Sequence, residues 1–191
     1  VRAYDYKEVL DYSFLFYEAQ RSGKLPANNR VEWRRDSVID DGREQGVDLS
    51  GGWYNEGDAR KENFPMAATV SFLAWSGIES KGKYQKAGMW ETFKDSIKWP
   101  LDYLLKCDTG KDLYYRCAGE RATYWEDDLT IPNTPRTCYS ISYDLPASDL
   151  AGEMAAAFAL SSVIFCDSDA AYARKLLAKA KSLYAHADSK R

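Results

Sequence analysis

The sequence predicts an all-α fold in which five helices form part of a larger helical array. Five segments carry apolar residues at helical spacing, over residues 4–21, 64–80, 83–106, 149–166 and 169–187. Strand signals are weak and short, at residues 113–117 and 138–143. Two long irregular stretches, residues 22–62 and 108–147, join the helices. Loops of this length inside a compact domain are usually either functional or wrongly assigned as loops.

The first helical segment is apolar on nearly every side, which predicts cover on more than one face. Its apolar residues are Tyr6, Val9, Leu10, Phe14, Phe16 and Tyr17. The second segment has Pro65 in its first turn, where proline is tolerated, whereas Pro100 lies inside the third and predicts a kink. Five helices do not close an array that would cover the first one. We therefore expect the natural chain to continue beyond Arg191.

Composition excludes several classes of function. The chain has 191 residues and a formal net charge of −3, with no basic block, so a nucleic-acid partner is not expected. No uninterrupted apolar run reaches about 18 residues, so no membrane span is expected. A single histidine and four cysteines in no zinc spacing predict neither a metal site nor a cofactor.

The four cysteines permit disulfides without showing which ones form. Cys107 and Cys117 are the closest pair in the sequence and would close a small hairpin, but the pairing stays open. Cys166 follows an apolar helical segment, and we expect it to be a buried thiol.

A glycine-rich loop over residues 46–58 carries the candidate chemistry. It places three carboxylates next to two aromatic rings: Asp48, Glu56 and Asp58 beside Trp53 and Tyr54. Glycoside hydrolysis needs one carboxylate to activate water, a second to protonate the leaving oxygen, and rings to hold the sugar. Acidic loop residues are more often solvated or capping groups, so the loop alone leaves the function open.

The chain resembles the family 9 glycoside hydrolases, which are mostly endo-β-1,4-glucanases. The likeness runs in the family's order through residues 16–26, 33–34, 36–37, 41–42, 46–54, 64–67 and 148–153. It implies a closed (α/α)6 toroid of six helical hairpins, in a domain more than twice this length. Residues 1–191 would then be the N-terminal part of a single catalytic domain, with a partial toroid.

The resemblance also implies roles for individual residues. The family's Asp-Ala-Gly-Asp sequence corresponds to residues 55–58, so Asp58 is the expected general base. Asn55 replaces the aspartate that helps to hold the attacking water, and Ala59 replaces a histidine. Tyr54 and Trp125 are candidate stacking rings. Trp53 is expected to be structural, and Asp48 to organise its own loop.

The implied function is that of a secreted, extracellular endo-β-1,4-glucanase that inverts the anomeric configuration. Its partner would be a β-1,4-glucan, without a cofactor, and its full-length form a monomer. The family's general acid and its His/Arg motif lie toward the C-terminus, and no segment here resembles them. Asn55 and Ala59 keep open an alternative, a non-catalytic member that binds β-glucan. A purely structural helical domain is the third interpretation.

Overall fold

The structure, a computed structural model, describes residues 4–55, 59–119 and 136–190. All five predicted helices are confirmed, with bounds shifted by up to seven residues, because the second runs on to Lys86 and the third begins only at Trp90. They are α1 (Tyr6–Ala19), α2 (Asn63–Lys86), α3 (Trp90–Cys107), α4 (Ser148–Phe165) and α5 (Ala170–Ser189). A short 3-10 turn, η1 (Arg43–Gln45), lies in the first long loop.

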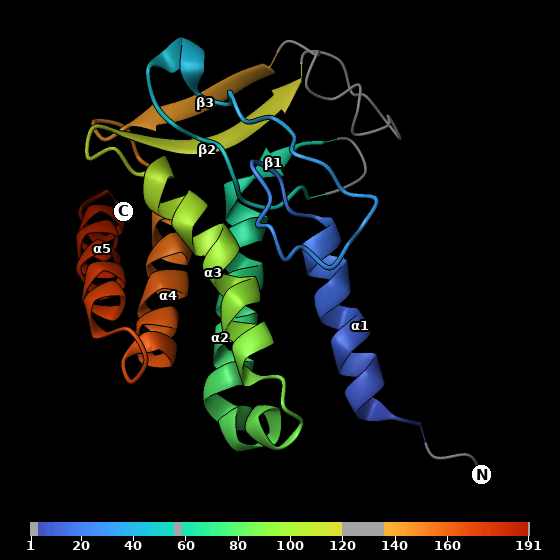
Figure 1. The fold of residues 1–191 in the computed structure, drawn as a ribbon. Helices are drawn as coiled ribbons and strands as arrows, with labels where there is room; N and C mark the ends of the chain where they lie inside the picture. Colours follow the sequence, from blue (N-terminus) through green and yellow to red (C-terminus); the bar gives the residue numbers. More distant parts are fainter. Residues whose placement is uncertain (1–3, 56–58, 120–135, 191) are drawn as a thin grey trace.

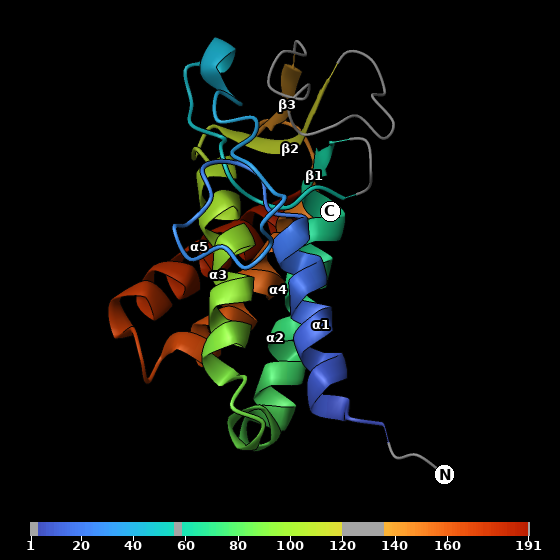
Figure 2. The same ribbon diagram turned by 45° about the vertical axis from the view of Figure 1, so that its right-hand side comes forward.

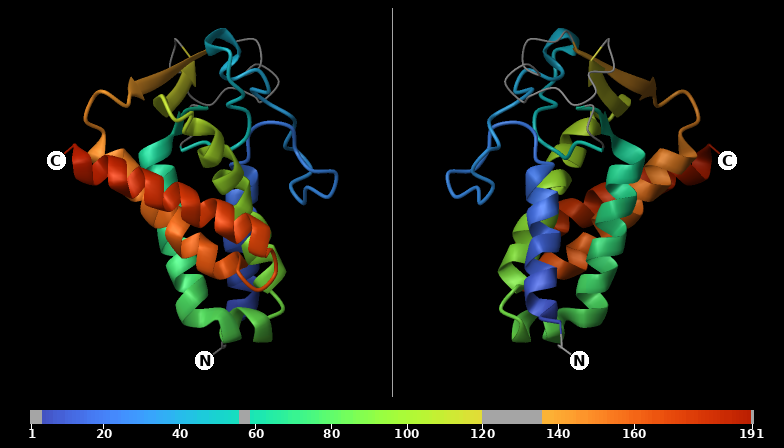
Figure 3. Two further views of the ribbon diagram at one scale, coloured as in Figure 1. Left: turned by 90° about the vertical axis from the view of Figure 1, so that its left-hand side faces the viewer. Right: turned by 90° about the vertical axis from the view of Figure 1, so that its right-hand side faces the viewer.

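The helices pack side by side with their axes running up and down the molecule (Figure 1). α4 lies against both α5 and α2, and α3 lies against α2. The α4–α5 pair forms one flank and α1 the other (Figure 1), and in the left view of Figure 3 α4 and α5 run obliquely across the front. The apolar stripes meet between them and are fully buried at Val70, Phe93, Ile97, Leu101, Met154, Phe158 and Leu176. Burial of these stripes is the main favourable contribution to the fold.

Among the described helices, α4 alone is long and apolar enough by length and composition to cross a membrane. More than half of it, 56%, is buried inside the fold. Its contacts with α2 and α5 account for its apolar character as that of a central helix.

A small antiparallel sheet adds to the predicted all-α architecture. Its order is β1 (Lys61–Glu62), β2 (Asp112–Gly119), β3 (Arg136–Ser142), and it lies across one end of the helices (Figure 1). β2 and β3 confirm the two short strands that the sequence predicts. β1 has only two residues, too few for any alternation to appear in the sequence.

The prediction of a kink at Pro100 is corrected. α3 runs on through Pro100, and the irregular backbone lies instead at Ser80 in α2, with φ −125° and ψ 20°. Among the described residues α1 buries only Phe14 and Glu18, as expected for five helices that do not close the array, and its cover on further faces stays a prediction. Four of its apolar side chains remain largely exposed among the described residues: Tyr6, Val9, Tyr12 and Phe16.

Gly52 provides a test of the packing beneath the loop. Its φ is +82°, and a Cβ there would lie 2.7 Å from Cδ1 of the buried Tyr103 ring. Gly52→Ala therefore combines left-handed backbone strain with a clash, and we expect a loss of about 1–3 kcal/mol in the free energy of unfolding. Gly46→Ala is the matched control, since its φ is +71° and no atom lies within 4 Å. Equal shifts in Tm for the two variants would contradict the packing role of Gly52.

Candidate functional site

The long loops gather at the same end of the molecule as the sheet (Figure 2). α1 ends there, α2 begins there, and the loop over residues 46–55 passes between them and α3. Within it, Gly51 and Gly52 have φ values of 91° and 82°, which residues with a Cβ rarely adopt. The glycines thus let the chain turn directly before the aromatic pair.

Asp48 organises its own loop, as the sequence predicts. Its Oδ1 accepts hydrogen bonds from the backbone N–H and the hydroxyl of Ser50, at 2.9 and 2.6 Å. Its Oδ2 pairs with Lys106 at 3.0 Å. These contacts tie the loop to the last turn of α3.

Trp53 is structural, as expected. It is buried, and its ring stacks on Tyr17 of α1 with 4.9 Å between the ring centroids. It also forms an isolated β-bridge with Arg21, just beyond the end of α1. Trp53 therefore fixes the loop against the first helix.

Tyr54 is also buried, with 4% of its surface exposed. Its hydroxyl donates a hydrogen bond to Ser37 Oγ at 2.8 Å, and the Arg34 guanidinium lies 5.0 Å from the ring centroid. Burial raises the pKa of this phenol above its ordinary value. Little of the ring is free to meet a sugar in this arrangement, and its stacking role stays a prediction.

Asn55 forms hydrogen bonds across the base of the loop over residues 55–60. Its side-chain Oδ1 accepts a hydrogen bond from the backbone N–H of Glu62 at 3.0 Å, and its own N–H donates to the carbonyl of Arg60 at 2.9 Å. Because the Glu62 partner is a donor, the amide must present its oxygen to it. The remaining Nδ2 can donate a hydrogen bond to a water but cannot accept one.

The other two predicted site residues, Asp58 and Trp125, lie outside the described residues. The described residue next to Asp58 in the chain is Ala59, which is buried and has a φ of 56°. Positive φ is unusual for a residue with a Cβ. The described chain thus reaches the loop from both sides, at Asn55 and at Ala59.

A shallow pocket of about 130 Å³ opens beside Asn55. Aromatic rings of α1 form part of its wall, together with the start of α2: Phe16, Tyr17, Pro65 and Met66. From the sequence, Phe16 and Tyr17 belong to an apolar stripe of the first helix. The only sign that they could border the loop is their position in the last turn of α1, three residues or fewer before its end.

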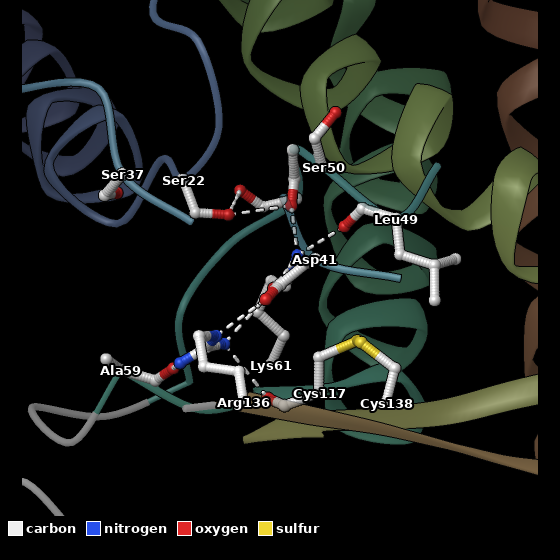
Figure 4. A network of polar contacts seen from close by, with 12 residues as sticks. Ser22, Ser37, Asp41, Leu49, Ser50, Ala59, Lys61, Cys117, Arg136 and Cys138 are labelled. Carbon is white, nitrogen blue, oxygen red and sulfur yellow. Dashed lines mark hydrogen bonds and ion pairs between the residues drawn. A yellow bond between two sulfur atoms is a disulfide. The ribbon is translucent and has the colours of Figure 1, made fainter. Parts of the chain in front are cut away.

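Three charged side chains, Asp41, Lys61 and Arg136, are buried between residues 49–51 and Ala59 (Figure 4). Asp41 Oδ2 pairs with Lys61 Nζ at 2.8 Å, and Asp41 Oδ1 pairs with Arg136 Nε at 2.7 Å. Lys61 is fully buried, and burial lowers the pKa of its amine while Asp41 acts to raise it. The sequence resemblance includes Asp41, but no residue pattern brings these three positions together.

The cysteine pairing differs from the pair considered from the sequence. Cys117 and Cys138 form the disulfide, because they face each other in the β2–β3 register. Cys107 is a free, buried thiol at the end of α3, and burial raises its pKa to about 11. The expectation for Cys166 is wrong, since this thiol lies exposed just after α4.

Other polar residues outside the loop have structural contacts. His186 is buried and stacks on Tyr143, with 4.3 Å between the centroids, and Glu153 accepts a hydrogen bond from Ser71 Oγ at 2.8 Å. In the described ranges, one group has the spacing of metal ligands: Asp41, Cys117 and Cys138. Its sulfurs are joined in the disulfide and its carboxylate already pairs with two cations. This group therefore does not fit a metal ion.

Curated proteins to which this chain is similar include endoglucanases of bacteria and plants. Endoglucanase 4 of Bacillus sp. (strain KSM-522) is 44% identical over 191 residues, covering 98% of this chain and 30% of that protein. Endoglucanase 16 of Arabidopsis thaliana is 46% identical over 188 residues, covering 97% of this chain and 38% of that protein. The chain thus spans about a third of the length of these relatives.

Solved structures agree. An endoglucanase of the termite Nasutitermes takasagoensis superposes with a TM-score of 0.91 at 41% identity, over 100% of this chain and 44% of that one. The cellulase Cel9M of C. cellulolyticum, solved in complex with cellobiose, gives 0.88 at 31% identity, over 99% and 45%. The helices described above are therefore part of an (α/α)6 toroid. The family model described as Glycosyl hydrolase family 9 matches residues 6–191, and the chain belongs to that family.

Proposed function

We propose that this chain is the N-terminal part of the catalytic domain of an endo-β-1,4-glucanase that acts on cellulose or a related glucan with inversion. The observation that carries the proposal is the fixed frame around the loop over residues 55–60. Asn55 and Glu62 close the loop through the contact at 3.0 Å, and Ala59 is held by Arg136 at 2.9 Å. Family membership and the names of the relatives support the substrate class.

In the proposed mechanism, Asp58 accepts a proton from a water that attacks the anomeric carbon. A general acid from the rest of the protein protonates the leaving glycosidic oxygen. Inversion requires the two carboxyl groups to stand roughly 6.5–9.5 Å apart, so that the water fits between the base and the sugar. Because no segment of these 191 residues resembles the acid, we propose that the chain alone does not hydrolyse glucan.

We also propose that the protein is secreted, as a monomer. Structural disulfides persist mainly in oxidising compartments such as the extracellular space. The Cys117–Cys138 bridge across β2 and β3 therefore supports this location.

One observation favours the second candidate function, a non-catalytic member that binds β-glucan. The Asn55 oxygen already accepts a hydrogen bond from the Glu62 N–H, and the neutral amide brings no negative charge to the water. Without that charge, loss of the water's proton is less favoured. An aspartate at this position could keep the Glu62 contact with one oxygen and accept from the water with the other.

Asn55→Asp separates the two candidates. In the full-length protein we expect kcat to rise about 10- to 100-fold, since a hydrogen bond to a charged group is worth about 1.5–3 kcal/mol. The measurement is reducing-sugar release from soluble β-glucan. Gln85→Glu, the same amide-to-carboxylate change at the exposed far end of α2, is the control. Absence of turnover in both the parent and Asn55→Asp, with β-glucan binding retained, would favour the binding protein.

A further inference from the structure

The buried charges under the loop connect distant parts of the chain. Asp41 lies in the first long loop, just before η1, Lys61 lies in β1, and Arg136 begins β3. Figure 4 shows the Asp41 carboxylate between the two cationic side chains. The exposed fractions of the Asp41, Lys61 and Arg136 side chains are 1%, 0% and 9%. Charges this deep are retained only when they are paired and hydrogen-bonded.

Lys61 is held mainly by the loop that precedes the aromatic pair. Its Nζ donates to the carbonyl of Leu49 at 2.6 Å and to that of Gly51 at 3.1 Å, and lies 4.5 Å from the Tyr103 ring centroid. These contacts and Asp41 satisfy the ammonium. Lys61 thus holds residues 49–51, directly before the aromatic pair. It pairs with Oδ2 of Asp41, so that Oδ1 is available to Arg136.

Arg136 contacts the loop over residues 55–60 at Ala59. Its Nε and Nη2 bind the two oxygens of Asp41 at 2.7 and 3.2 Å, which fixes the plane of the guanidinium. In that orientation its Nη1 donates to the carbonyl of Ala59 at 2.9 Å, and Nη2 also reaches the carbonyl of Cys117 at 3.3 Å. The Cys117 contact anchors the same side chain to β2.

Ala59 needs such a contact. Its φ of 56° is a left-handed conformation that costs free energy in a residue with a Cβ. Such a conformation persists when the surroundings hold it in place. The hydrogen bond from Arg136 is a contact of this kind, from a side chain 77 residues further along the chain.

We propose that Arg136, oriented by Asp41, is a positioning residue for hydrolysis, which holds the Ala59 carbonyl and thereby the backbone that follows Asp58. The proposal rests on the proposed function, in which Asp58 is the base. A base misplaced by about 1 Å can cost about 100-fold in rate. We expect the effect on kcat, because Arg136 is largely buried and holds the loop through the Ala59 carbonyl.

The test uses Arg136→Met and Arg136→Lys in the full-length protein. Lysine can keep the ion pair with Asp41, but a single ammonium does not reproduce the rigid fork that also reaches Ala59. We therefore expect Arg136→Lys to retain most of the parent's Tm, and both variants to lose about 10- to 100-fold in kcat with KM changed far less. Arg43→Met, an exposed arginine paired with Asp40 at 3.4 Å, is the control and should leave kcat unchanged. An unchanged kcat in Arg136→Lys would overturn the positioning role.

Hydrogen exchange provides a readout that does not need turnover. The backbone amides of Asn55 and Glu62 are bonded across the base of the loop. We expect both to exchange faster in the two Arg136 variants than in the parent or in Arg43→Met. Unchanged exchange would overturn the proposal, even in a protein without activity. A parent that does not hydrolyse glucan would refute the proposed function. Faster exchange in the Arg136 variants of such a protein would still support the contact by which Arg136 holds the loop.

Discussion

Asp58→Asn in the full-length protein is expected to lower kcat by about 10²–10⁴-fold, the usual contribution of a positioned acid or base. Asparagine has nearly the shape of aspartate, but its neutral amide cannot accept the proton that the attacking water must lose. KM should change much less, because the sugar contacts are retained. The measurement is reducing-sugar release from soluble β-glucan, with equal Tm values showing that the parent and the variant are folded.

A surface carboxylate provides the matched control. Asp167 is exposed and pairs with Lys81 at 2.9 Å, away from the loop. Asp167→Asn makes the same chemical change and should keep the parent's kcat. If Asp58→Asn behaves like Asp167→Asn, Asp58 is not the base.

Asp58→Ala with added azide tests the role more directly. Azide is a nucleophile that carries no proton to remove, so it needs no base. It would form a bond to the anomeric carbon as the glycosidic oxygen leaves with a proton from the acid. Turnover that rises with azide concentration, with a glycosyl azide of inverted configuration as product, is expected. Rescue without that product would argue against a base role for Asp58.

The helices could be predicted because their apolar stripes repeat at helical spacing, independently of what they pack against. Phe93, Ile97, Leu101 and Leu104 are all fully buried, as their spacing indicates. In α1 the same spacing marks apolar residues that the described chain leaves uncovered, and Phe16 remains largely exposed there. Periodicity shows which face is apolar, but not whether another segment covers it.

The contacts of the site depend on pairing across long sequence distances, which periodicity does not report. Cys117 pairs with Cys138 because two strands lie in register, although Cys107 is closer along the chain. Asp41 and Arg136 are 95 residues apart and meet only in the folded protein. Charged residues in loops are usually solvated, so nothing in the sequence marked these two as buried.

Asp41→Asn is expected to destabilise the full-length protein by about 3–5 kcal/mol, the usual cost of removing one partner from a buried ion pair. The amide leaves Lys61 and Arg136 buried near each other without a counter-charge. Asp40→Asn is the matched control, because its carboxylate is 72% exposed and meets Arg43 at only 3.4 Å. Its effect should be far smaller, as for most surface pairs. Similar losses in urea unfolding for the two variants would contradict the burial argument.

The loss in Asp41→Asn should also shrink as the pH rises. Burial already lowers the pKa of Lys61, and Asp41 is the first contact that opposes this shift. Without Asp41, the pKa of Lys61 in the folded state falls further below that in the unfolded state. Between these two pKa values the unfolded chain binds more protons, so stability rises with pH, and it rises over a wider range in the variant than in the parent. Cys107 beside Lys61 has its pKa raised to about 11 and stays neutral in this range. Urea unfolding of both proteins at about pH 7 and pH 9 should therefore show a smaller difference at the higher pH, and a constant difference would contradict a fall in the pKa of Lys61 into this range in the variant.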